Sequence, residues 1–231
     1  MGAAGTSADN PTIEDLFSID LYDGSSGLVI TNNIDLAGEG GMVWGKSRNL
    51  TESHWIVDSN RGTGSNNNFK YLRPDNSGQE SDGANKSIAT FNSNGFTFQG
   101  ADDQFNGSGN QYVTWTFRKA PNFFDVVTYT GTGSAKTVAH SLGVAPSFFM
   151  VKNSDEREDW AAYHKSLNQG SNPENYYVIP HLTNMQADDS AWWNDTAPTS
   201  SVFTVGTDDA VNKDGENYVA YLWADHSGLD A

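Results

Sequence analysis

Cysteine is absent from this chain of 231 residues, so no disulfide can contribute to its fold. A chain of this length buries enough apolar surface to fold without disulfides or metals. The redox compartment stays unassigned, because cytosolic and extracellular proteins both occur without cysteine. Runs of about 18 apolar residues are also absent, and the N-terminus shows no basic region followed by an apolar one. We therefore expect neither membrane insertion nor a secretory leader.

Positive charge is scarce, with 13 Lys and Arg residues against 29 Asp and Glu residues and a formal net charge of −16. Such a charge repels phosphate backbones, and no basic stripe offsets it, so we expect no nucleic-acid binding. Catalytic signatures are lacking too: the chain contains no Gly-x-Ser-x-Gly elbow, Walker loop, dinucleotide fingerprint or His-Glu-x-x-His motif. The sequence therefore favours a non-enzymatic protein.

The composition favours strands joined by many turns. The chain holds 23 glycines, abundant Asn, Ser and Thr, and 12% aromatic residues. Short runs rich in β-branched and aromatic residues predict strands, and Asn-Gly and Asp-Gly pairs between them suit tight hairpin turns. The sequence therefore predicts an all-β, antiparallel fold. The predicted strands cover residues 27–31, 112–117, 126–129, 148–151, 176–179 and 218–223.

The chain contains an internal repeat, in which residues 20–119 recur in altered form at residues 126–225. An offset of about 106 residues relates the two copies, as in Leu36 and Leu142 or Lys46 and Lys152. A unit of roughly a hundred residues fits an autonomous sandwich domain better than a solenoid turn. We expect an N-terminal arm at residues 1–14 and two tandem β-sandwich domains at 15–120 and 121–231. The Asn-rich loop of the first unit, at residues 62–68, is expected to be longer than its counterpart, as in duplicated domains that divide their functions.

Several segments of the repeat carry a resemblance to a known family. The second unit contains YTGTGSAKT at 129–137, SFFMVK at 147–152, WAAYHKSL at 160–167 and YVAYLWAD at 218–225, and the first contains GMVWGKSR at 41–48 and HWIVDSNRG at 54–62. In this order they resemble the repeat of tail-fibre and other virion-surface proteins of marine bacteriophages, including cyanophages. The resemblance implies jelly-roll or concanavalin-like sandwiches in a homo-oligomeric, trimeric appendage that contacts other virion proteins and the host surface.

Tryptophans are the first candidates for a binding site, because sugar rings stack on exposed indoles. Trp55 and Trp160 occupy equivalent positions in the two units, and Trp44, Trp115 and Trp223 lie in strand-like runs, so we expect these five to pack in cores. Trp192 and Trp193 differ, because they are adjacent in a polar segment. In an extended chain they would point in opposite directions, which predicts that one is exposed and contacts a ligand such as host surface glycan.

Acidic turns are the second candidates. Both units keep an Asp-Asp-x-x-Asn-x-x-Gly pattern, in which carboxylate and amide oxygens could bind Ca²⁺. The alternative is turn chemistry, because Asp and Asn also bond to their own backbone, and neither segment reproduces an EF-hand loop. Both interpretations stay open. The candidate calcium ligands are Asp102, Asp103, Asn106, Asp208, Asp209, Asn212 and Asp214.

The sequence and the resemblance together favour a structural protein on the surface of a phage virion. The first hypothesis is a tail-fibre or appendage component that binds host surface glycan. The second is a capsid decoration or cement protein that binds the major capsid protein. A third, a polysaccharide-degrading appendage enzyme, would need two carboxylates in a cleft, and no pair stands out.

Overall fold

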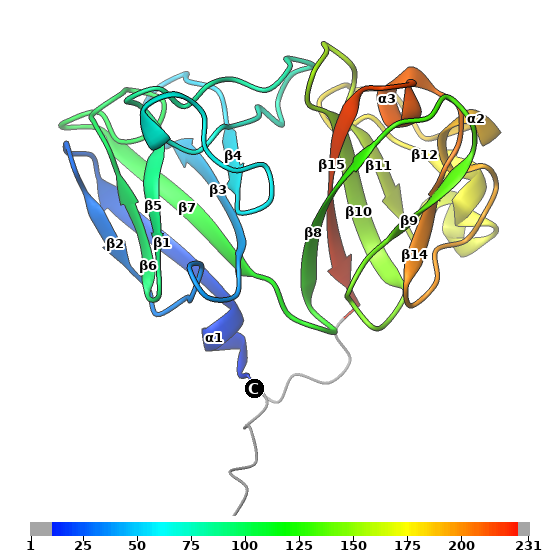
Figure 1. The fold of residues 1–231 in the computed structure, drawn as a ribbon, viewed down its shortest axis with the longest axis horizontal. Helices are drawn as coiled ribbons and strands as arrows, with labels where there is room; N and C mark the ends of the chain where they lie inside the picture. The colour runs from blue at the N-terminus through cyan, green and yellow to red at the C-terminus, as the bar shows by residue number, and fades with distance from the viewer. Residues whose placement is uncertain (1–10, 226–231) are drawn as a thin grey trace, which may run out of the picture.

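The computed structural model of the protein describes residues 11–225, and within this range the chain is all-β. Fifteen strands form several antiparallel sheets, and the α-helices are short. Figure 1 shows the strands gathered into two halves joined by the segment between β7 and β8. Residues 1–10 of the predicted N-terminal arm lie outside the described residues.

The first half contains two antiparallel sheets. The larger has the strand order β1-β7-β3-β4, and the smaller has the order β2-β6-β5. Inward-facing side chains of these sheets and of the turn at residues 103–106 form a core that includes Trp55, Phe96 and Phe105. The elements are α1 (Ile13–Leu16), β1 (Phe17–Asp23), β2 (Val29–Thr31), β3 (Gly41–Ser47), β4 (Trp55–Asp58), η1 (Ser65–Asn67), β5 (Ile88–Asn92), β6 (Gly95–Phe98) and β7 (Gln111–Arg118).

The second half has a larger sheet of order β11-β10-β15-β8 and two-stranded sheets β14-β9 and β12-β13. Its core includes Phe149, Trp193 and Phe203. The strands are β8 (Phe124–Thr130), β9 (Lys136–Ala139), β10 (Pro146–Asn153), β11 (Ala161–His164), β12 (Tyr176–Tyr177), β13 (Ala187–Asp188), β14 (Val202–Val205) and β15 (Asn217–Ala224). The helices are η2 (Leu167–Gly170), η3 (Pro173–Asn175), α2 (Ser190–Trp193) and α3 (Asp209–Asn212).

The two halves repeat the same strand order. The order β4-β3-β7-β1 corresponds to β11-β10-β15-β8, and β2-β6 corresponds to β9-β14. Each half also holds a stacked tyrosine pair, with ring centroids 5.2 Å apart for Tyr22 and Tyr112 and 5.1 Å apart for Tyr129 and Tyr218. The similarity between residues 20–119 and 126–225 in the sequence therefore corresponds to the same arrangement of strands.

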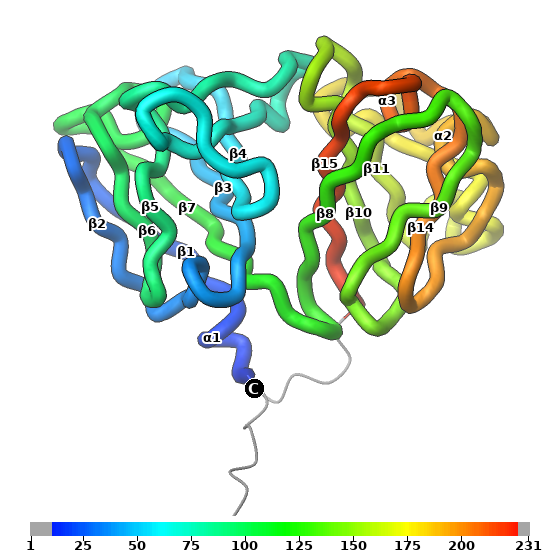
Figure 2. The backbone as a smooth tube through the Cα atoms, viewed as in Figure 1, coloured from blue at the N-terminus to red at the C-terminus, as the bar shows by residue number. Residues whose placement is uncertain are grey.

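A third apolar core lies between the two larger sheets. It combines Met42 and Ile56 of the first half with Val126, Trp160 and Tyr221 of the second. Figure 2 shows β3 and β4 on one side and β8 and β15 on the other, flanking the middle of the molecule. Because this core takes side chains from both halves, neither half buries all of its apolar surface without the other.

Buried charges also connect the two halves. Arg61 is almost fully buried, with its Nε 2.6 Å from Oδ2 of Asp58 and its Nη1 3.1 Å from Oε2 of Glu80. The hydroxyl of Tyr221, in the second half, donates a hydrogen bond to the same Asp58 oxygen. Burial alone would lower the pKa of Arg61, but the carboxylate of Asp58 holds that pKa above its ordinary value. The guanidinium therefore remains charged and paired.

Candidate functional site

A pocket of about 450 Å³ lies beside β5 in the first half. Its wall is formed by the turn at residues 36–37, the loop at residues 59–69 and β5 itself. We call it the β5 pocket. Figure 1 shows the loop after β4 crossing in front of the sheets on the side that faces the second half. The side chains that line it include Ser59, Thr63, Asn67, Phe69, Thr90 and Phe91.

The loop beside the pocket owes its shape to glycine and asparagine. Gly62, Asn66 and Asn67 have φ values of 72°, 57° and 59°, in the left-handed region that glycine and asparagine tolerate best. Asp82 anchors the loop by accepting hydrogen bonds from the backbone N–H of Ser65, at 2.8 Å, and from its hydroxyl. The Asn-rich composition noted in the sequence thus builds one wall of the pocket.

The chemistry of the β5 pocket is aromatic and neutral. Phe69 and Phe91 stack with ring centroids 4.4 Å apart; Phe91 is buried in the core of the first half and Phe69 is partly exposed, so Phe69 supplies the aromatic surface that faces a ligand. Among the described residues, no hydrogen bond engages the side chains of Thr63, Asn67 or Thr90, so their donors and acceptors are available to a ligand. No charged side chain lines the pocket. Aromatic surface beside neutral hydroxyl and amide groups suits an uncharged polyhydroxylated ligand.

The prediction that Trp192 or Trp193 is exposed is wrong. Their exposed fractions are 5% and 1%. The segment is not extended: Asp189 caps the short helix α2 through its side chain, and neighbouring residues on a helical turn can both face the core. Trp192 stacks on Tyr177 with centroids 3.8 Å apart, and Nε1 of Trp193 donates to the carbonyl of Tyr176. Neither indole offers an open face to a sugar.

The other tryptophans divide into two groups. Trp55 and Trp160 are fully buried, which confirms the prediction that they pack in cores. Trp44, Trp115 and Trp223 are only partly buried, because they lie on the outward faces of the two larger sheets. Trp44 and Trp223 nevertheless pack against the core between the two larger sheets, so the prediction of core packing is confirmed for these two as well.

The acidic turn of the first half uses its side chains for local bonds. Oδ1 of Asp102 accepts the N–H of Gln104, and Asp102 also pairs with Lys86. Asp103 accepts a bond from the amide of Asn110. Asn106 is fully buried, and its amide donates to two backbone carbonyls at 2.7 Å and 2.6 Å. These contacts are the turn chemistry that the sequence allowed.

The second half repeats these contacts. Asp208 caps α3 by accepting the N–H of Ala210, and the amide of buried Asn212 donates to two backbone carbonyls at 2.7 Å and 2.6 Å. Burial raises the pKa of Asp208. Asp209 and Asp214 are exposed. Within residues 11–225, no three or more His, Cys, Asp or Glu side chains come together where they could hold a metal ion, so nothing in the structure supports the calcium interpretation.

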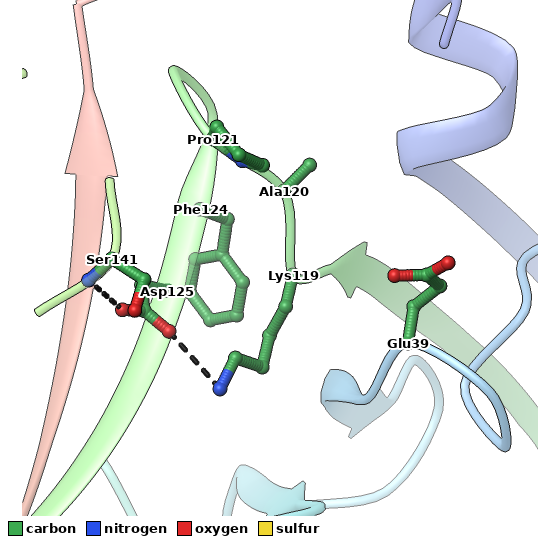
Figure 3. Close-up of a pocket in the computed structure, with 7 residues that line it drawn as sticks. All are labelled: Glu39, Lys119, Ala120, Pro121, Phe124, Asp125 and Ser141. Atoms are coloured by element: carbon green, nitrogen blue, oxygen red, sulfur yellow. Dashed lines mark hydrogen bonds and ion pairs between the residues drawn. The ribbon is translucent and has the colours of Figure 1, made fainter. Parts of the chain in front are cut away.

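A smaller pocket of about 190 Å³ lies at the junction between the halves. Figure 3 shows the amine of Lys119 directed at the carboxylate of Asp125, 3.2 Å away. The other oxygen of Asp125 accepts the backbone N–H of Ser141 at 2.7 Å. Asp125 is buried, and both of its oxygens already have partners. This site therefore stabilises the connection between the halves and leaves no free carboxylate oxygen for a ligand.

The fold and the pockets define an all-β protein with a neutral, partly aromatic pocket in its first half. The chain belongs to the family described as a domain of unknown function, DUF7483, whose model matches residues 12–231. That match spans both halves and covers every described residue except Pro11. A search of curated proteins found no match. No helix within residues 11–225 is long and apolar enough to cross a membrane.

Proposed function

We propose that this chain is a non-enzymatic structural protein of a phage virion surface, a component of a tail fibre or similar appendage, and that its β5 pocket binds neutral glycan on the host. The observation that carries the proposal is the pocket itself, where the Phe69–Phe91 stack adjoins unengaged Thr63, Asn67 and Thr90. The virion assignment is supported by the sequence resemblance.

Two physical arguments favour a neutral sugar. Pyranose rings present apolar C–H surface to aromatic side chains and hydroxyls to neutral polar groups, and the β5 pocket supplies both. The formal charge of −16 repels acidic polysaccharides, since no charged group lines the pocket to offset it. A pocket of about 450 Å³ falls in the ordinary range for small ligands, which suits one or two sugar units of a longer chain.

The proposal includes a finer description of the architecture. We infer two tandem antiparallel β-sandwich domains of jelly-roll or concanavalin-like type, displayed as a homo-oligomer for which the resemblance suggests a trimer. The repeated strand order and the matched tyrosine pairs support this description. The second domain also has an Asn-rich loop, at residues 168–175, but the pocket with the Phe69–Phe91 stack belongs to the first, where we place glycan binding.

The test applies labelled protein to intact host cells and, in parallel, to phage heads that lack decoration proteins. We expect saturable cell binding that free host surface polysaccharide competes away and that Phe69→Ala reduces. Thr137→Ala, which alters a pocket of the second half, is the matched control and should bind normally. Binding to heads alone would overturn the proposal in favour of a decoration protein, and release of new reducing ends from the polysaccharide would overturn it in favour of an enzyme.

A further inference from the structure

One face of the first half is apolar and partly uncovered. In a row across the larger sheet, Ile19 pairs with Trp115, Trp115 with Trp44, and Trp44 with Ile56. Residues paired across antiparallel strands place their side chains on the same face. Along this row Ile56 is buried, Trp44 and Trp115 are half-buried, and Ile19 is 57% exposed. Leu21, on the same face of β1, is 65% exposed.

The equivalent row of the second half is completely covered. There Val126 pairs with Tyr221, Tyr221 with Met150, and Met150 with Ala162. All four side chains are buried, and all belong to the core between the two larger sheets. The repeat therefore presents the same face twice, once under another sheet and once with its β1 end open to solvent.

We propose that Ile19, Leu21, Trp44 and Trp115, which we call the β1 face, dock against a second copy of this chain. The β1 face is continuous with the interface that already joins the two halves, since Ile56 in the same row belongs to that interface. In the second half, the corresponding row is covered by a sheet of this same chain. The molecule therefore already contains one partner that fits such a face, and that partner is a sheet of the same kind. The proposal does not depend on glycan binding.

The edge of the sheet supports the same inference. β1 ends the strand order of its sheet, so within the described residues its outer edge pairs with no strand. Exposed edges are usually protected by charged side chains, proline or a bulge; β1 contains neither lysine nor proline, and its one exposed aspartate, Asp23, lies at its last position. The carboxylate of Asp20 accepts a hydrogen bond from the side chain of Asn32, so it places no charge on the β1 face. Large exposed apolar side chains at an open edge mark an interaction site.

Charge predicts how the association depends on salt. Each copy carries a formal charge of −16, so two copies repel each other at low ionic strength while their apolar faces attract. Added salt screens this repulsion, because the Debye length falls to about 8 Å at physiological ionic strength. We therefore expect association to strengthen as salt increases, the opposite of the trend for an interface made of ion pairs.

The test measures self-association of the full chain by sedimentation equilibrium over a range of protein and salt concentrations. We expect species larger than the 25.1 kDa monomer. Ile19→Glu combined with Leu21→Glu should raise the dissociation constant at least about tenfold, because carboxylates would be buried against an apolar surface. The matched control is Val29→Glu, on β2 of the other sheet, where Val29 is 54% exposed and its substitution should change nothing.

A covalent reporter identifies what covers the face. The chain has no cysteine, so Leu21→Cys introduces a single attachment point for a benzophenone photocrosslinker. Illumination should give a band of two linked chains for Leu21→Cys and none for Val29→Cys. A wild-type protein that stays monomeric at every concentration would overturn the proposal, as would assembly that persists in the double glutamate variant. Crosslinking confined to single chains would also overturn it, because a segment of the same chain would then occupy the face.

Discussion

The hydroxyl of Tyr221 donates a hydrogen bond to Oδ2 of Asp58 over 2.7 Å, and the two residues belong to different halves of the chain. Both are buried, and Asp58 also binds Arg61. This contact joins β15 to β4 in the core between the larger sheets. Because a buried polar group has no water to replace a lost partner, the stability of each half depends on the other here.

Tyr221→Phe is expected to lower the free energy of unfolding by about 1–3 kcal/mol, because it leaves one buried carboxylate oxygen short of a donor. The measurement is urea denaturation. Tyr163→Phe is the matched control: its ring is also buried, but within the described residues its hydroxyl makes no hydrogen bond. Equal losses for the two variants would show that the contact across the halves contributes nothing.

Stability should rise with pH above about 8, and Lys152 should cause the rise. Burial lowers the pKa of Lys152 from its ordinary value of 10.5 to about 8. Between these values the unfolded chain binds a proton that the folded chain has released, so the free energy of unfolding increases with pH. The rise should end near pH 10, where burial of Tyr221, whose pKa is raised well above 10.0, has the opposite effect.

The check on this prediction compares two lysines in equivalent positions. Lys152 contacts the carbonyls of Asn153 and Glu156, and Lys46 contacts those of Ser47 and Leu50, but only Lys152 is fully buried. Lys152→Met should flatten the rise in stability between pH 8 and pH 10, and Lys46→Met should leave it unchanged. No thiol titrates in this range, since the chain has no cysteine. An unaltered slope in Lys152→Met would contradict the assignment.

The buried asparagines should matter more than the aspartates beside them. Asn212→Ala removes two bonds donated to carbonyls and one accepted from the N–H of Thr132, and it should cost about 3 kcal/mol of stability. Asn106→Ala should have a similar effect in the first half. Asp209→Ala, at an exposed position, should change stability by less than about 0.5 kcal/mol. Thermal or urea unfolding of the three variants provides the comparison.

Calcium should leave the melting temperature unchanged, because the oxygens of Asp102 and Asn106 are engaged by the protein itself. The experiment compares melting curves with millimolar calcium and with a chelator, using magnesium at the same concentration as the control for ionic strength. A rise specific to calcium, and lost in Asp102→Asn, would instead establish the calcium site that the sequence pattern allowed.

The sequence predicted the strands well where the pattern was local. The run at residues 112–117 alternates between buried and partly exposed side chains, and it lies within β7 as expected. The internal repeat also anticipated the equivalent strand orders, because matching residues such as Lys46 and Lys152 occupy β3 and β10. The prediction that Trp192 or Trp193 is exposed assumed an extended chain, in which neighbouring side chains point in opposite directions. The segment instead forms a helical turn, capped by the side chain of Asp189.

The β5 pocket could not be located from the sequence. Its aromatic pair, Phe69 and Phe91, comes from a loop and a strand with 21 intervening residues, and no periodic pattern links them. The Asn-rich loop was recognised as unusual, but its neighbours in space were not. The same limit applies to Trp44 and Trp115, whose partial exposure depends on where the second half docks.

The most direct test of the account is a titration of ¹⁵N-labelled protein with neutral mono- and disaccharides, followed by amide chemical shifts. We predict saturable shifts confined to residues 36–37, 59–69 and 89–91, abolished by Phe69→Ala and retained by Thr137→Ala. Shifts clustered elsewhere, or no shift with any neutral sugar, would contradict the proposal that the β5 pocket binds glycan.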